Sequence, residues 1–147
     1  MVTLHAWTLL ISYAAFFLAV VAGVLFLVQE RQLKRKDPRI LEAAVLPLEM
    51  LDQVNLWAVG IGFLLFSLGM VPGLVLARSN WGAFFSGDPK EILSWMTWAA
   101  YGAVFGLRLK AGLKGHRVVL LSVMSFFLAL FTFIGVNTLL KSRHLFF

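Results

Sequence analysis

Four long stretches of the sequence contain no charged residue, and charged or polar segments separate them. These stretches cover residues 1–29, 53–77, 92–107 and 118–140. An α-helix rises about 1.5 Å per residue, so about 20 apolar residues are needed to cross the hydrocarbon core of a bilayer. Three of the stretches are long enough alone, whereas the stretch 92–107 is short.

A helix start signal stands just before the short stretch. Asp88 can serve as the N-cap, Pro89 suits the first helical position, and Glu91 stands where a capping-box carboxylate reaches back to the cap. A helix that begins at Pro89 has about 20 residues up to Leu109, enough to span. We therefore predict an all-α integral membrane protein with four transmembrane helices in a single domain, 1–147. The predicted spans are residues 5–28, 54–77, 89–109 and 118–140, with an outer loop at 78–91.

The composition supports a membrane protein. Hydrophobic residues make up 61% of the chain and charged residues 14%, and the mean hydropathy is +0.88, all outside the averages of soluble proteins. The absence of Cys excludes disulfides, thiolate metal sites and thioether attachment of a cofactor to this chain. No Lys or Arg precedes the first stretch, and it is longer than a signal-peptide core, so we expect it to remain in the mature protein.

The positions of the basic residues predict an orientation. The connection 30–52 carries five of the thirteen Lys and Arg residues, and residues 108–117 carry four. The positive-inside rule places both basic connections in the cytoplasm, and both termini and the loop 78–91 on the outer, extracytoplasmic side. The net charge of +6 therefore reflects membrane orientation, and no nucleic-acid partner is predicted.

The connection 30–52 has two interpretations. Asp37 and Pro38 can start a short helix, and Pro47 can bend it. This segment has enough apolar residues to lie at the membrane interface; they are Ile40, Leu41, Ala44, Val45, Leu48 and Leu51. A solvated basic loop is the alternative.

The three histidines fall at different places in this topology. His116 lies in the cytoplasmic turn, where an exposed side chain is expected, whereas His5 and His144 both fall at the outer surface. Two imidazoles on one face, without an acidic cluster or Cys, suit a bis-histidine haem iron better than zinc. Ordinary interfacial histidines are the alternative.

A haem site also needs aromatic surfaces and groups that receive two anionic propionates. The loop offers Trp81, Phe84 and Phe85 as aromatic surfaces. Lys90, Arg143 and the positive end of the third helix are candidates for the propionates. An aromatic belt with flanking charges is the alternative interpretation of the same residues.

The uncharged polar residues and glycines of the spans are predicted to pack helices. No Asp, Glu, Lys or Arg is predicted at mid-membrane, which argues against an ion-coupled transporter. No nucleophile, base and orienting acid can be assembled, so no independent catalytic activity is predicted. Close helix approach is expected at the glycines of the second and third spans, namely Gly60, Gly62, Gly69, Gly102 and Gly106.

Several segments, in order, resemble one protein family. The segment WGAFFSGDPKE (81–91) is similar to the tryptophan-rich (WWD) signature WGSYWSWDPKE of the CcsA/CcmC/ResC (HemX-like) cytochrome c biogenesis proteins. TWAAYGAVFGLRLKAGLKGHR (97–117) resembles the helix and turn that follow it. LFTFIGVNTLLKSRH (130–144) and LHAWTLLISYAAF (4–16) resemble the spans that carry the two external histidines.

The resemblance implies a function. In that family the signature loop and the external histidines hold haem at the outer surface and present it to apocytochrome c. His5 and His144 match the axial ligands, here for a haem b. The matching signature residues are Trp81, Asp88, Pro89, Lys90 and Glu91, and further matches are Trp98, Tyr101, Arg108, Gly135 and Asn137. The family implies work within a haem lyase or cytochrome c synthase system.

Two departures from the family pattern leave a second function open. A family Tyr position is Phe84 here, and two Trp positions are Phe85 and Gly87, so the signature is degenerate. Family members also carry further spans with intramembrane histidines. We therefore expect either a haem-presenting module that works with other membrane subunits, or a structural or electron-transfer subunit of a respiratory or photosynthetic complex with one haem or none. The cytoplasmic membrane or a thylakoid-type membrane is the expected location.

Overall fold

The computed structural model describes residues 2–36, 47–85, 87–135 and 138, and this part of the chain is helical without strands. Its elements are the helices α1 (Val2–Lys34), α3 (Leu48–Trp81), α4 (Pro89–Lys110) and α5 (His116–Leu130), and the π-helix η1 (Phe131–Gly135). Three segments are long and apolar enough to cross a membrane, namely α1, α3 and the continuous α5–η1 segment. The prediction of an all-α, multi-pass membrane protein is confirmed, whereas a crossing by α4 remains a prediction.

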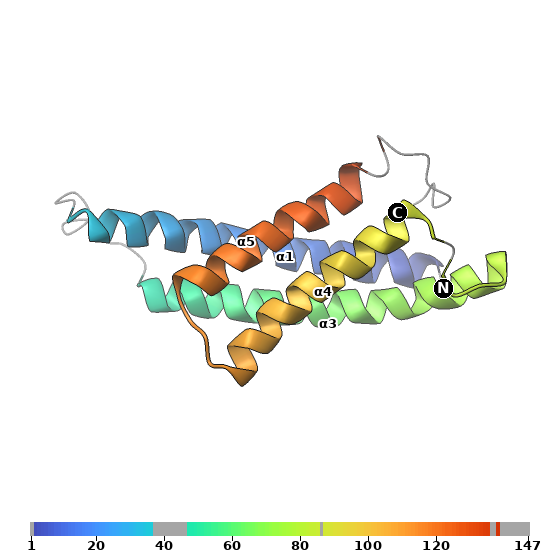
Figure 1. Cartoon of the computed structure of the whole chain (residues 1–147), viewed down its shortest axis with the longest axis horizontal. Helices are drawn as coiled ribbons and strands as arrows, with labels where there is room; N and C mark the ends of the chain where they lie inside the picture. The colour runs from blue at the N-terminus through green and yellow to red at the C-terminus, as the bar shows by residue number, and fades with distance from the viewer. Residues whose placement is uncertain (1, 37–46, 86, 136–137, 139–147) are drawn as a thin grey trace.

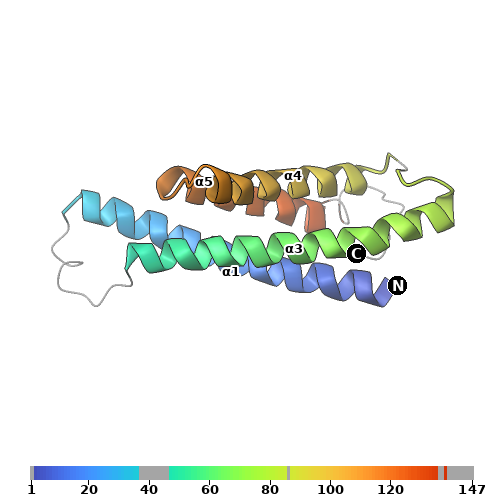
Figure 2. The ribbon, with the colours of Figure 1, turned by 90° about the horizontal axis from the view of Figure 1, so that it is seen from below.

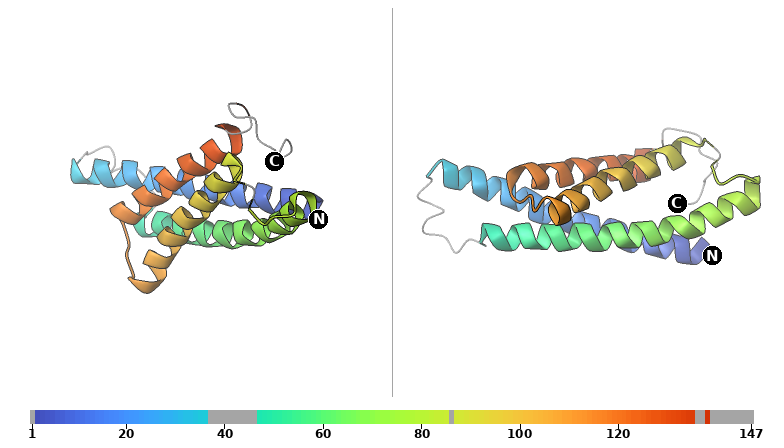
Figure 3. Two further views of the ribbon diagram at one scale, coloured as in Figure 1. Left: turned by 45° about the vertical axis from the view of Figure 1, so that its right-hand side comes forward. Right: turned by 60° about the horizontal axis from the view of Figure 1, so that its bottom comes forward.

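The helices form two antiparallel pairs. α1 and α3 make one layer, α4 and α5 make the other, and the second pair crosses the first obliquely (Figures 1 and 2). The start of α1, the end of α3, the start of α4 and the end of α5 lie toward one end, which we call the signature end (Figure 3). The opposite end, where α3 and α5 begin, is the basic end. This arrangement brings His5 toward the signature residues.

The start of α4 follows the local sequence signals. Pro89 is the first helical residue, and Oδ1 of Asp88 accepts a hydrogen bond from the backbone N–H of Lys90 at 2.9 Å. The predicted N-cap is therefore confirmed. The helix ends at Lys110, one residue beyond the expected limit. Asp88 is buried, so this cap ties the connection 82–88 to the helix.

The limits of α3 differ from the expected span. The helix begins directly after Pro47, which is its N-cap residue. The short helix that Pro47 was expected to bend lies outside the described residues. At the other end α3 continues to Trp81 and stops at Gly82, whose φ of 72° is left-handed and suits glycine. The connection to α4 is thus confined to 82–88. The predicted helix start at Asp37 and Pro38 lies outside the described residues.

Close packing of α1 on α3 depends on glycine. A Cβ atom on Gly62 would lie 2.6 Å from Cδ1 of Phe16, whose buried ring stacks on Tyr101 with centroids 3.7 Å apart. Similar close contacts confirm the prediction for Gly60 and Gly69, which would meet Phe105 and Leu9, and a looser one for Gly102 against Phe63. The prediction of close helix approach was wrong for Gly106, because a Cβ atom there would meet no atom within 4 Å.

Replacing Gly62 with Ala is expected to lower the free energy of unfolding by about 1–3 kcal/mol, because overpacking displaces the fully buried ring of Phe16. Gly106→Ala is the matched control. It adds the same methyl group to open space in another helix, so it should be neutral or slightly stabilising through helix propensity. Thermal unfolding of both variants in detergent tests this, and equal midpoints for the two would contradict it.

Hydroxyl groups link the helices within the bundle. Ser12 donates to the carbonyl of Gly62 at 2.7 Å, joining α1 to α3. The indole N–H of Trp98 donates to Oγ of Ser67 at 2.9 Å, joining α4 to α3. Thr97 and Thr132 lie 3.2 Å apart through their hydroxyl oxygens. These contacts agree with a helix-packing role for the Ser and Thr residues of the spans.

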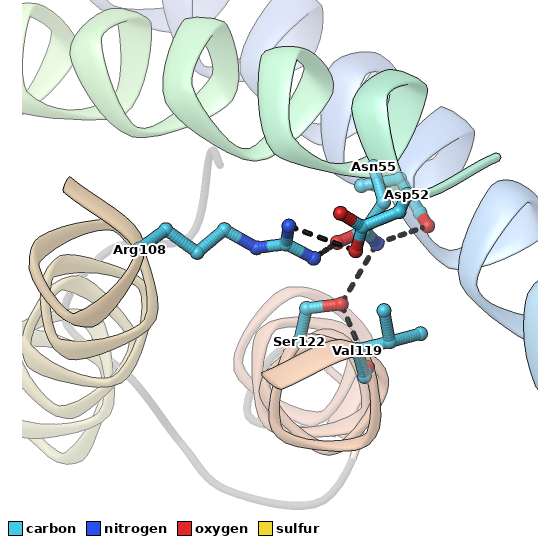
Figure 4. Close-up of polar contacts among 6 residues, drawn as sticks. Asp52, Asn55, Arg108, Val119 and Ser122 are labelled. Carbon is cyan, nitrogen blue, oxygen red and sulfur yellow. Dashed lines mark hydrogen bonds and ion pairs between the residues drawn. The ribbon is translucent and has the colours of Figure 1, made fainter. Parts of the chain in front are cut away.

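A buried polar network connects all four helices nearer the basic end (Figure 4). Arg108 of α4 donates from Nη1 to Oδ1 of Asp52 at 2.9 Å and from Nη2 to Oδ1 of Asn55 at 2.8 Å. Asn55 in turn donates from Nδ2 to the carbonyl of Ala19 at 2.8 Å and to Oγ of Ser122 at 2.9 Å. The network was not foreseen, because the sequence placed Arg108 and Asp52 in the basic connections.

His116 is exposed, as predicted, with 53% of its side chain accessible. Its Nδ1 nevertheless lies 2.7 Å from Oε2 of Glu30, which also pairs with Lys34 at 3.2 Å. These contacts join the first residue of α5 to the end of α1. His116 is therefore a surface contact at the basic end and is separated from the signature end by the length of the bundle.

Candidate functional site

A pocket of about 520 Å³ opens at the signature end, a size typical of small-molecule and cofactor sites. It lies between the two helix pairs, and α1, α3, the connection 82–88, α4 and η1 all contribute to its lining. Most of the lining is apolar or aromatic, with a few polar groups among them. The lining residues are Val2, His5, Ala6, Trp7, Leu9, Leu10, Tyr13, Phe66, Met70, Gly73, Leu74, Leu76, Ala77, Asn80, Trp81, Phe84, Lys90, Glu91, Ser94, Trp95, Thr132 and Phe133.

His5 contributes an imidazole to this pocket. Its Nδ1 lies 2.6 Å from the backbone carbonyl oxygen of Gly69 on α3. A carbonyl only accepts hydrogen bonds, so Nδ1 must carry the hydrogen, and the neutral ring then has its lone pair on Nε2. Within the described residues, Nε2 has no hydrogen-bond partner. That nitrogen is available as a ligand atom.

Aromatic side chains form the walls of the pocket. Trp81 comes from the last turn of α3, Phe84 from the connection, and Trp95 from the second turn of α4. The guanidinium carbon of Arg78 lies 4.6 Å from the centroid of the Phe84 ring, a cation–π contact that positions this ring. Flat apolar surfaces from three elements thus surround one opening.

Lys90 gives the pocket a positive charge at its rim. It stands in the first turn of α4, outside the three helices that are apolar enough to span a membrane. The Asp88 carboxylate attracts the Lys90 ammonium group. Because Asp88 already accepts one N–H of the first turn, the side chain of Lys90 is the stronger candidate for an anionic ligand group than the helix end itself.

The π-helix η1 supplies the last wall. Its residues Thr132 and Phe133 line the pocket. Thr132 donates to the carbonyl of Leu128 at 2.9 Å, and the Phe133 ring lies 5.1 Å from that of Tyr13. π-Helical turns change the register of a helix and are frequent at functional sites. Here the π-helical turn, which continues α5, contacts α1 through Phe133 and Tyr13.

The predicted site residues are distributed unevenly around this pocket. His5, Trp81, Phe84 and Lys90 line it together. Phe85 is 54% exposed and lies outside the lining, and Asp88 is buried as the helix cap. The second predicted ligand, His144, and Arg143 lie outside the described residues.

Comparison with known proteins gives the family. The family described as cytochrome C assembly protein matches residues 1–144. The chain belongs to the cytochrome c assembly protein family. The chain is 36% identical over 96 residues to the cytochrome c biogenesis protein CcsA of Prochlorococcus marinus subsp. pastoris, covering 65% of this chain and 31% of the relative. No solved structure matches it.

Other relatives align over almost the whole chain. The protein of the same name from Prochlorococcus marinus strain MIT 9215 is 30% identical over 155 residues, covering 92% of this chain and 50% of the relative. That of Chlamydomonas reinhardtii is 27% identical over 141 residues, covering 96% of this chain and 39% of the relative. The chain thus spans between about a third and a half of the length of these relatives.

Several pocket residues of the chain were not predicted as site residues. Leu9 and Tyr13 follow His5 at intervals of four, so helical periodicity alone places them on its face. Ser94 follows Lys90 at the same interval in α4. Asn80 and Thr132 have no such signal, because their inclusion depends on how the two helix pairs cross.

Proposed function

We propose that this cytochrome c assembly protein holds haem b at the signature end, with His5 and His144 as axial ligands, and presents it to apocytochrome c together with other membrane subunits. One observation carries the proposal: the pocket brings His5 of α1 together with Trp81 and Lys90 of the signature segment. These residues are far apart in the sequence, and the family resemblance assigns them to one haem site.

The residues of the pocket fit a haem group. The available Nε2 of His5 is a suitable iron ligand. Gly73 leaves room for the imidazole ring, because a Cβ atom there would lie 2.8 Å from Cε1 of His5. Trp81 and Phe84 offer apolar faces for the macrocycle, and Lys90 offers a cation for a propionate.

Each residue then has a separate task in haem presentation. His5 holds the iron through Nε2, and its Nδ1–H continues to donate a hydrogen bond to the carbonyl of Gly69. Trp81 and Phe84 exclude water from the apolar faces, and Lys90 orients the anionic edge. Haem is the cargo of the reaction and supplies the group that apocytochrome c receives. The protein itself contributes binding and orientation and has no acid-base role in the proposal.

The proposal includes a topology. α4 is the fourth crossing, the signature end faces the extracytoplasmic side of the cytoplasmic or thylakoid-type membrane, and residues 1–147 act as one membrane domain. The support is the clustering of basic residues around 30–52 and 108–117. Cysteine accessibility tests it, since the chain has no Cys of its own. A Cys at Gly87 should react with an impermeant reagent added outside, and a Cys at Gly112 should not; the reverse pattern would overturn the orientation.

Copurification from native membranes tests the function. The haem-presenting role predicts that the tagged chain carries haem and retains added apocytochrome c, and that His5→Ala loses both. His116→Ala is the matched control, because this exposed histidine lies at the basic end, and it should retain both. A haem-free wild-type chain would contradict the proposal.

A structural or electron-transfer subunit of a larger complex is the second candidate. The observation that favours it is the replacement of two signature Trp residues by Phe85 and Gly87. Under this alternative the tagged chain copurifies in fixed ratio with respiratory or photosynthetic subunits and does not retain apocytochrome c. The same purification therefore separates the two functions.

A further inference from the structure

We propose that two glycines of α3, Gly69 and Gly73, are positioning residues for His5: they set the tautomer and the orientation of its ring, so that Nε2 is the only nitrogen that a metal can reach. The part that concerns haem iron rests on the proposed function. The part that concerns the ring itself does not, because it follows from contacts of the protein alone.

The hydrogen bond to Gly69 selects the tautomer. Nδ1 of His5 lies 2.6 Å from the carbonyl oxygen of Gly69. A hydrogen on Nε2 and a lone pair on Nδ1 would bring two acceptors to this distance, which is repulsive. The Nδ1–H form is therefore favoured before any metal binds.

A proline interrupts the helical hydrogen bonds of α3 next to this contact. Pro72 lies inside the helix between the two glycines. A proline has no backbone N–H, so the carbonyl four residues earlier, that of Leu68, has no helical donor. The carbonyl of the next residue, Gly69, accepts the bond from α1.

Gly73 provides the space for the ring. A Cβ atom there would lie 2.8 Å from Cε1, 3.2 Å from Nδ1 and 3.6 Å from Nε2 of His5. The imidazole thus lies against the backbone of α3, and any side chain at position 73 would push it away. The contact also covers the Nδ1 side of the ring, so a metal can approach only from the Nε2 side.

This arrangement has a chemical consequence for ligation. Hydrogen bonding of the second ring nitrogen to a backbone carbonyl holds a ligand imidazole in orientation and raises its basicity. Loss of such a partner typically weakens metal binding about 10–100-fold. Gly73→Ala should therefore weaken haem binding by about 10–100-fold although both ligand histidines remain in the chain.

Nitrogen NMR of the haem-free protein tests the ring directly. The probe is the full chain carrying His116→Gln and His144→Gln, labelled with ¹⁵N-histidine and placed in lipid bilayers at alkaline pH, where imidazoles are neutral. His5 is then the only histidine. We expect protonated Nδ1 and unprotonated Nε2, and a mixture of both tautomers when Gly73→Ala is added. A protonated Nε2 with Gly73 present, or an unchanged spectrum in Gly73→Ala, would overturn the inference.

Haem titration of the chain with its native histidines is the second readout. Gly62→Ala serves as the matched control: Gly62 is in the same helix as Gly73, its Cβ would clash with Phe16 at 2.6 Å, and neither Gly62 nor Phe16 lines the pocket. We expect Gly73→Ala to lose affinity about 10–100-fold and Gly62→Ala to lose less than about 3-fold. Equal losses of haem affinity in the two variants would show that Gly73 acts only through helix packing and would overturn the inference. If His5→Ala binds haem like the wild type, the proposed function fails, whereas the NMR result still decides the tautomer.

Discussion

Replacing Arg108 with Met is expected to lower the free energy of unfolding by about 3–5 kcal/mol, the largest stability effect predicted for this protein. The substitution leaves the buried carboxylate of Asp52 and the amide oxygen of Asn55 without their donor. A buried charge that loses its partner costs about this much, because its desolvation is no longer offset by attraction. Thermal unfolding in detergent measures the loss.

The double variant Asp52→Leu/Arg108→Met shows whether the stability lost in Arg108→Met comes from the unpaired charge of Asp52 or from altered packing. Removing both charges of a buried pair is often neutral, so most of the stability should return. A deficit of about 1–3 kcal/mol should remain, since the Asn55 oxygen still lacks a donor. A double variant less stable than Arg108→Met alone would contradict the assignment of the cost to the unpaired Asp52 charge.

Replacing His5 with Ala is expected to weaken haem binding more than about 100-fold, because it removes an axial ligand. Removing only the hydrogen-bond partner of a ligating histidine already lowers metal affinity about 10–100-fold. The low-spin absorption of a bis-histidine haem should disappear with it. An optical titration of the purified chain with haem measures both. His116→Ala, a histidine removed from the opposite end of the bundle, should leave affinity and spectrum unchanged.

The second axial position gives an independent check on the same titration. His144→Ala should abolish the low-spin spectrum as His5→Ala does, and the double variant should add little to either single one, because both belong to one site. Low-spin haem that persists in His144→Ala would leave His5 as a ligand and would assign the other axial position to a different residue.

Features set by neighbouring residues could be predicted from the sequence. The start of α4 at Pro89, with Asp88 as its cap, needs only four residues in a row, and the signal is local. Likewise, the apolar stretches around α1, α3 and α5 were evident from length alone. The predicted limit of the second span at residue 77 was less accurate, because α3 continues past the charged Arg78 to Trp81.

Features that depend on the crossing of helices could not be predicted. Gly60 and Gly106 look equivalent in sequence, yet one contacts Phe105 and the other faces open space, because helix rotation decides the contact. The positive-inside rule treated Arg108 as a solvated charge beside a span, because the rule counts basic residues and does not consider buried partners such as Asp52 and Asn55. The acceptor of His5, the carbonyl of Gly69, has no side-chain signal at all. For the site, the sequence predicted His5, Trp81, Phe84 and Lys90, but not how Asn80 or Thr132 joins them.

Pulsed EPR of the ferric-haem-loaded chain tests the central claim most directly, because it detects the nuclei bound to the iron. The chain is labelled with ¹⁵N-histidine and compared with the equally labelled His5→Ala variant. The proposed site predicts a low-spin signal with ¹⁵N couplings from axial imidazoles, one of which is lost in His5→Ala. A wild-type spectrum without axial ¹⁵N coupling, or one that His5→Ala leaves unchanged, would show that the pocket at the signature end does not hold haem through His5.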